Sequence, residues 1–126
     1  MKKEIKTQLA PQAIGPYSQA VEYGNLIFCS GQIGINYQTG DLISDDIQLQ
    51  TQQVITNIRN ILEAAGSALD KVLQMQVFLV NLDDFVLFNE VYAQYFDAGV
   101  KPARFTVVVS SLPKNAKIEI ACIAYK

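Results

Sequence analysis

Two segments near the C-terminal end, residues 102–109 and 117–124, are almost wholly apolar, yet the first contains an arginine and the second contains a glutamate. Arg104 lies in the first segment and Glu119 lies in the second. Both segments are short, rich in β-branched residues and without a clean polar side, which predicts strands buried, or nearly so, on both faces. A buried charge costs several kcal/mol unless it is paired or hydrogen-bonded. Arg104 and Glu119 are therefore expected either to form a structural ion pair or to line a cleft that binds a ligand.

The two charged residues differ in how easily a plain structural role explains them. Arg104 lies at the start of its strand, two residues after Pro102, and charged side chains at strand ends often extend to solvent. Glu119 lies inside its strand, where that explanation is weaker. A functional role is thus better supported for Glu119 than for Arg104 on position alone.

Composition excludes several classes of function. The chain has 126 residues, half of them hydrophobic, which predicts one domain spanning residues 1–126. Its net charge is −2, and its longest basic stretch is Lys2-Lys3 with Lys6. Nucleic acid is therefore not expected as a partner, because binding phosphates requires a positive surface.

The chain contains no histidine. This removes Ser-His-Asp and Cys-His chemistry and the commonest metal ligand. Cys29 and Cys122 are isolated in apolar runs, so we expect two buried free thiols and no zinc site. No cofactor-binding glycine motif is present, and we expect neither a cofactor nor a metal. No secretory signal or long apolar segment is visible, which favours a reducing, cytoplasmic location and no membrane partner.

The pattern of elements predicts an α+β fold. A helix is expected from about residue 45, with an Asp45–Gln48 capping box, to Gly66, because an apolar stripe recurs there at helical spacing. A second helix is expected from Asp83 or Asp84 to about residue 96, with an aromatic stripe on one face that predicts packing in the core. The expected strands are residues 4–7, 18–23, 26–30, 72–80, 103–109 and 117–124, with a tight turn at Tyr23-Gly24-Asn25 between the second and the third. Both helices should cover one face of a mixed sheet. Since the strands are apolar on both sides, other copies of the chain are expected to cover the second face.

The register of the last two strands decides whether the two charges can meet. If residues 103–109 and 117–124 pair as a hairpin, the numbers of opposed residues have a constant sum. Arg104 and Glu119 then share a face only when this sum is odd, and Thr106 would join them. An even sum would place them on opposite faces and would exclude a shared cleft within one subunit.

Several segments, in their order and spacing, resemble one protein family over nearly the whole length. The matching segments are residues 13–20 (AIGPYSQA), 30–33 (SGQI), 57–66 (NIRNILEAAG), 77–80 with 82, 84 and 85, then 89, 92 and 96, then 102–104 (PAR) and 117–120 (KIEI). The chain resembles the RidA (YjgF) family of reactive imine and enamine deaminases. The resemblance implies a chorismate-mutase-like α+β fold, a homotrimer with ligand clefts between subunits, and no cofactor.

The resemblance also implies an activity, namely hydrolysis of 2-imino acids such as 2-iminobutanoate and 2-iminopropanoate to 2-keto acids and ammonia. Arg104 would bind the substrate carboxylate through two hydrogen bonds. Glu119, with a pKa raised by apolar surroundings, would activate water and return a proton to the departing nitrogen. The other residues expected at the substrate are Tyr17, Ser30, Gly31, Thr106, Phe88 and Asn89.

Some of these assignments have alternatives. Tyr17 is either a wall of the cleft or a packing residue after a Gly-Pro turn. Thr106 stands where many family members carry cysteine, so a thiol is either unnecessary or replaced by a hydroxyl. Phe105 should point away from Arg104. A trimeric protein that binds small carboxylates without turnover is the main alternative function, although such a protein would not need Glu119.

Overall fold

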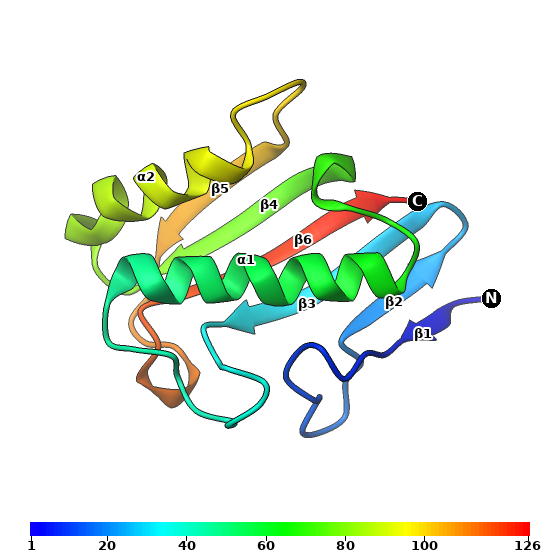
Figure 1. Cartoon of the computed structure of the whole chain (residues 1–126), viewed down its shortest axis with the longest axis horizontal. Helices are drawn as coiled ribbons and strands as arrows, with labels where there is room; N and C mark the ends of the chain where they lie inside the picture. Colours follow the sequence, from blue (N-terminus) through cyan, green and yellow to red (C-terminus); the bar gives the residue numbers. More distant parts are fainter.

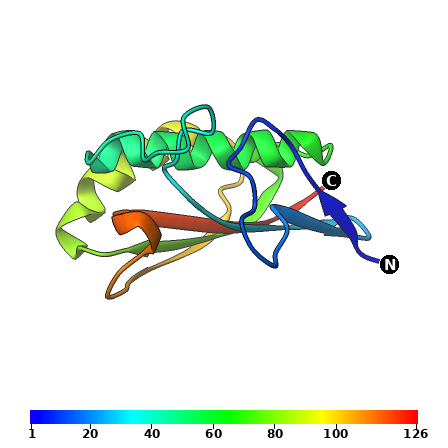
Figure 2. The ribbon, with the colours of Figure 1, turned by 90° about the horizontal axis from the view of Figure 1, so that it is seen from below.

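The computed structural model describes all residues, 1–126, as two helices packed on one face of a six-stranded mixed sheet (Figures 1 and 2). The strand order is β1-β2-β3-β6-β4-β5. The strands are β1 (Lys3–Ile5), β2 (Ala20–Tyr23), β3 (Leu26–Ile33), β4 (Val72–Leu79), β5 (Ala103–Val108) and β6 (Ile118–Tyr125). The helices are α1 (Ile47–Ala64) and α2 (Phe85–Tyr95), with 3-10 turns η1 (Leu69–Lys71), η2 (Leu82–Asp84) and η3 (Pro113–Asn115). The predicted α+β plan is confirmed, and none of these helices is long and apolar enough to cross a membrane.

Helix α1 forms where the apolar spacing predicts it. The N-cap is Asp46, whose side chain accepts a hydrogen bond from the Leu49 N–H, so the cap lies one residue after the predicted Asp45. Gly66 follows the last turn with a φ of 79°, as expected for a glycine that ends a helix. The predicted apolar stripe is buried against the sheet: Ile47, Thr51, Val54, Ile55, Ile58, Ile61, Leu62 and Ala65.

The first three strands form an antiparallel meander. Tyr23 pairs with Leu26, so Gly24 and Asn25 form the predicted two-residue turn between β2 and β3. Strand β3 continues to Ile33, beyond its predicted end at residue 30, because it pairs with β6 along its length. Cys29 and Cys122 lie opposite each other in this pairing as buried free thiols, as predicted.

The prediction that the last two strands could pair as a hairpin is wrong. Strand β5 runs parallel to β4, while β6 lies antiparallel between β4 and β3. Helix α2 makes the crossover that β4 and β5, as parallel neighbours, require. The chain then passes through η3 and enters the sheet on the other side of β4. Strand β5 is an edge strand and is largely exposed, so the expectation that it is buried on both faces fails for the single chain.

No helix covers the sheet face opposite α1 and α2 (Figure 2), and this uncovered face is apolar. Its large side chains are between 38% and 62% exposed: Tyr23, Leu26, Phe28, Phe105, Val107 and Tyr125. Phe105 points to this face, away from Arg104, and packs edge-on against Phe78. A patch of this kind is a candidate interface.

Candidate functional site

Arg104 and Glu119 project from opposite faces of the sheet. Arg104 is in register with Met75, which is fully buried beneath the helices. Glu119 is in register with Phe78, which belongs to the uncovered face. Because side chains alternate along a strand, the two charged groups cannot meet in one protomer. The prediction that Glu119 partners Arg104 within a single subunit's cleft is therefore wrong.

Arg104 is held between strand β5 and helix α2. Its guanidinium donates a 2.8 Å hydrogen bond from Nη1 to Oδ1 of Asn89. The guanidinium carbon lies 4.7 Å from the ring centre of Tyr92, 5.5 Å from that of Phe88 and 5.8 Å from that of Phe85. These distances are typical of cation–π contacts. Helix α2 presents these residues at a spacing of three or four, which places them on one face.

This partly buried cation has no carboxylate partner. The one ion pair in the chain joins Lys126 to Glu22, far from Arg104. A guanidinium carries five N–H donors, and hydrogen bonding to Asn89 occupies one of them. Thr106, two residues along the same face of β5, has a buried hydroxyl without a hydrogen-bond partner. The arrangement leaves donors available for an external anion.

Asn89 and Phe88 occupy different places around Arg104. Asn89 is partly buried and orients the guanidinium directly. Phe88 is fully buried, so its predicted contact with substrate is not supported by its position. Its ring instead lies beneath the guanidinium. The aromatic stripe predicted for α2 is thus core, as expected, and also supports the charge.

Glu119 lies beside a bulge in strand β3. Cys29 pairs with Cys122 and Gln32 pairs with Ile120, so Ser30 and Gly31 together oppose a single residue of β6. A methyl group added at Gly31 would collide with the Glu119 carboxylate and would lie 2.9 Å from its Cδ. The lack of a side chain at residue 31 therefore makes room for this carboxylate.

The close contact between Gly31 and Glu119 predicts that Gly31→Ala lowers the expected imine-hydrolysing activity without unfolding the protein. The residue does not have a positive φ, so alanine is tolerated by the backbone, and the colliding atoms are the mobile end of Glu119. The carboxylate should move, and we expect a loss of about tenfold to a hundredfold in kcat. Steady-state kinetics with circular dichroism as the folding control would test this. Wild-type kcat in a folded Gly31→Ala protein would contradict the proposed place of the carboxylate.

Burial raises the pKa of Glu119 above its ordinary value of 4.5. The folded protein therefore binds this proton more tightly than the unfolded chain does, and ionising Glu119 opposes folding. Stability gained from its protonation is present below pH 4.5 and is lost as the pH rises through the folded pKa. We expect Glu119→Gln to melt at a higher temperature than wild type near pH 7, with the difference vanishing below about pH 4. Glu4→Gln, at an exposed carboxylate, is the control; an equal gain there, or no gain at Glu119, would contradict the expectation.

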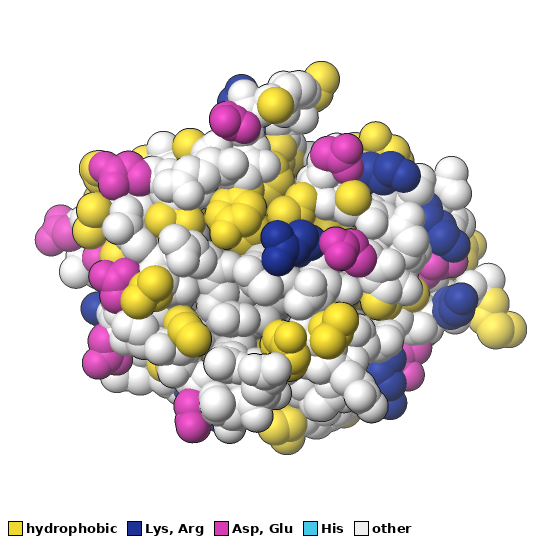
Figure 3. Space-filling view, viewed as in Figure 1, with side chains coloured by type: hydrophobic (Ala, Val, Ile, Leu, Met, Phe, Trp, Pro, Cys, Tyr) yellow, Lys and Arg dark blue, Asp and Glu magenta, His cyan; other side chains and the backbone are white.

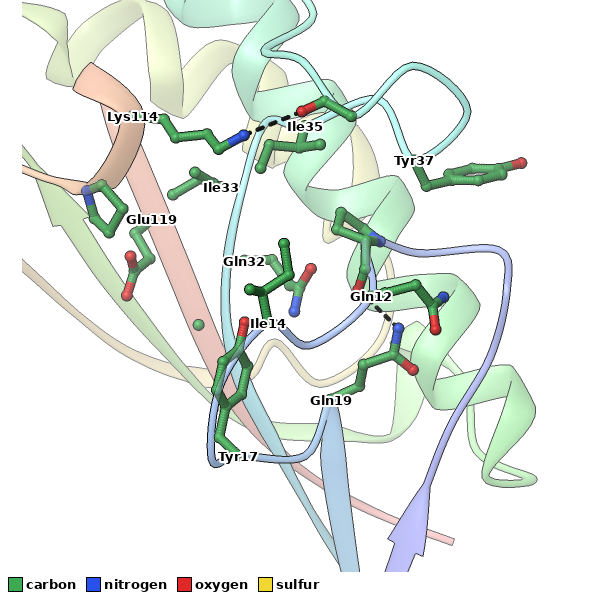
Figure 4. Close-up of a pocket in the computed structure, with 14 residues that line it drawn as sticks. Gln12, Ile14, Tyr17, Gln19, Gln32, Ile33, Ile35, Tyr37, Lys114 and Glu119 are labelled. Atoms are coloured by element: carbon green, nitrogen blue, oxygen red, sulfur yellow. Dashed lines mark hydrogen bonds between the residues drawn. The ribbon is translucent and has the colours of Figure 1, made fainter.

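A cleft of about 530 Å³ opens next to Glu119 (Figure 4). Tyr17 and Gly31 line it with Glu119, which supports the interpretation of Tyr17 as a wall residue, and Tyr17 is 53% exposed. Ser30 acts on the backbone instead, because its hydroxyl donates a 2.6 Å hydrogen bond to the Ser18 carbonyl and so fixes the segment that carries Tyr17.

Sequence reasoning missed other residues of the cleft. Lys114 lines it and donates from Nζ to the Gly40 carbonyl at 3.2 Å. Lys114 and Asn115 both adopt positive φ, of 55° and 58°, which non-glycine residues rarely do. The Pro-Lys-Asn turn was the available signal. Asn57 is a buried residue of α1. Its side-chain amide donates hydrogen bonds to the carbonyls of Ile33 and Ile35 and so holds the segment after β3, which also lines the cleft.

Comparison with known proteins places the chain in a family. The model of the family described as Endoribonuclease L-PSP matches residues 7–126. The chain belongs to this family. It is 52% identical to a RutC family protein of Pyrococcus horikoshii, over 100% of this chain and 99% of that protein. It is 44% identical to a 2-iminobutanoate/2-iminopropanoate deaminase of Dermatophagoides farinae, covering 97% of this chain and 94% of that one.

Solved structures of L-PSP family relatives have the same fold. A Rid family protein of Yersinia pestis superposes with a TM-score of 0.98 at 46% identity, covering all of both chains. Escherichia coli TdcF with bound serine superposes with a TM-score of 0.94 at 44% identity, over 98% of each chain. The resemblance noted from the sequence is confirmed at the level of family and fold.

Proposed function

We propose that this protein hydrolyses reactive 2-imino acids and their enamine tautomers to 2-keto acids and ammonia. The observation that carries the proposal is the partly buried Arg104 guanidinium, which has free donors and no acidic partner. A carboxylate fits such a site through two parallel charge-assisted hydrogen bonds. Relatives 44% and 47% identical are named as imine or reactive intermediate deaminases, and the relative TdcF binds serine, which carries a carboxylate.

The chemistry needs a base within reach of the water that attacks the substrate carbon. Water adds to the C=N carbon, forming a C–O bond, while the nitrogen gains a proton. The hydroxyl of the resulting carbinolamine then gives up its proton as the C=O bond forms, the nitrogen takes up a proton, the C–N bond breaks and ammonia leaves. Glu119, whose pKa burial raises, would accept the proton from water and return it to the departing nitrogen. Tyr17 would close the cleft beside it.

Since Arg104 and Glu119 lie on opposite sheet faces, one protomer cannot supply both groups to one substrate. We propose a homotrimer in which Arg104 of one protomer faces the Glu119 cleft of the next. The uncovered apolar sheet face supports assembly, because other copies would remove it from water. Each cleft would then be lined by two chains.

The assembly is tested by light scattering at micromolar concentration. We expect a mass about three times the 13.9 kDa of the chain. Phe28→Glu places a charge on the uncovered face and should reduce the mass, whereas Val86→Glu, on the outer side of α2, should not. A wild-type mass near that of one chain would contradict the proposed trimer.

The activity is tested by coupling a threonine dehydratase or an amino-acid oxidase to the purified protein. The protein should accelerate loss of the imine and release of ammonia beyond the spontaneous rate. Binding of 2-oxobutanoate without any acceleration would instead favour a carboxylate-binding regulatory protein. RNA cleavage is not proposed, because the helix face gathers no continuous basic patch (Figure 3) and the chain has no histidine.

A further inference from the structure

Tyr92 is the aromatic residue closest to the Arg104 guanidinium. Its ring centre lies 4.7 Å from the guanidinium carbon, closer than the rings of Phe88 and Phe85. Tyr92 is only 7% exposed. Because little water reaches this contact, its attraction is stronger than that of an exposed cation–π pair.

The Tyr92 ring is fixed from both sides. It lies 5.4 Å from the Phe88 ring and 4.6 Å from the Phe96 ring, centre to centre. These contacts run along one face of α2 to the residue that follows its end, so the ring cannot turn without moving its neighbours. Arg104, by contrast, has a long side chain on an exposed edge strand. The rigid Tyr92 ring therefore limits the conformations of the flexible Arg104 side chain.

The Tyr92 hydroxyl contributes differently from the ring. It is buried and has no hydrogen-bond partner, which ordinarily costs stability. Burial raises its pKa to about 12, although the nearby Arg104 guanidinium opposes that rise. The hydroxyl thus stays protonated and lies near enough to Arg104 to interact with it, while the ring centre lies 4.7 Å from the guanidinium carbon.

We propose that Tyr92 is a positioning residue for Arg104, and that its ring, rather than its hydroxyl, holds the guanidinium in the orientation that binds a carboxylate. This rests on the proposed carboxylate-binding role of Arg104. Asn89 accepts a hydrogen bond from one edge of the guanidinium and the Tyr92 ring lies close to it, so these two contacts limit how the remaining donors can turn. No acidic residue is needed for this, which preserves the positive charge for the ligand.

Two substitutions separate the ring from the hydroxyl. Tyr92→Leu removes the cation–π surface, and we expect the Kd for 2-oxobutanoate, measured by calorimetry, to rise about tenfold. KM for the imine should rise in parallel, with kcat within about threefold, since Asn89 still holds Arg104. Tyr92→Phe keeps the ring and should bind within about twofold of wild type. Val91→Ala, a buried change on the same helix, should leave the Kd unchanged in the folded protein.

A spectroscopic measurement makes the test independent of turnover. The Arg104 Nε–H resonance should carry a ring-current shift, which Tyr92→Phe keeps and Tyr92→Leu reduces to the part that Phe88 and Phe85 contribute. Wild-type Kd in folded Tyr92→Leu, or an equal loss in Tyr92→Phe, would overturn the proposal. If wild-type protein fails to hydrolyse imines, the proposed function fails, while the Kd and the Arg104 resonance still decide the role of Tyr92.

Discussion

Arg104→Lys is expected to lose most of the imine-hydrolysing activity while the protein stays folded. Lysine keeps the positive charge but cannot make two parallel hydrogen bonds to a carboxylate. One lost charge-assisted bond corresponds to about a hundredfold in kcat/KM, and Arg104→Ala should lose about a thousandfold. The measurement is steady-state kinetics, with thermal melting as the folding control.

The matched control for Arg104 is Lys101→Ala. Lys101 is an exposed cation shortly before β5, so its removal changes the net charge equally without touching the guanidinium. We expect wild-type kinetics from this variant. Near-wild-type rates from Arg104→Lys would show that the site needs only a positive charge, and the two-bond mode of binding would have to be abandoned.

The sequence predicted those parts of the fold that depend on local signals. The apolar stripe of α1, the Gly24-Asn25 turn and the aromatic face of α2 are set by spacing and by turn residues, and all three are confirmed. The buried free cysteines and the raised pKa of Glu119 follow from the apolar strands around them. In each case a short stretch of sequence contains the cause.

The pairing of β5 with β4 could not be predicted in this way. Nine residues separate β5 from β6, and nothing in that segment says whether β6 returns beside β5 or on the other side of β4. The packing of α2 over the sheet decides it. The same crossover brings Asn89 and Tyr92 over Arg104. Similarly, the bulge that makes room for Glu119 exists only in the pairing of β3 with β6.

Because Arg104 and Glu119 lie on opposite faces of the sheet, we expect activity to return when two inactive variants are combined in one trimer. Arg104→Ala and Glu119→Gln should each be inactive alone, because every site lacks one group. Coexpressed in equal amounts, they should form mixed trimers in which some sites take Arg104 from one variant and Glu119 from the other. Random assembly should restore about a quarter of the wild-type activity per chain.

A second mixture separates sites between chains from sites within one chain. Wild type coexpressed with the double variant Arg104→Ala/Glu119→Gln should also give about a quarter of the wild-type activity per chain if each site draws on two protomers. If both groups came from one protomer, this mixture would retain about half, and the two single variants would stay inactive together. Rates of the whole purified mixture, with the two chains present in equal amounts, distinguish these results. Because the sheet separates the two side chains within a protomer, we expect both mixtures to show about a quarter of the wild-type activity per chain.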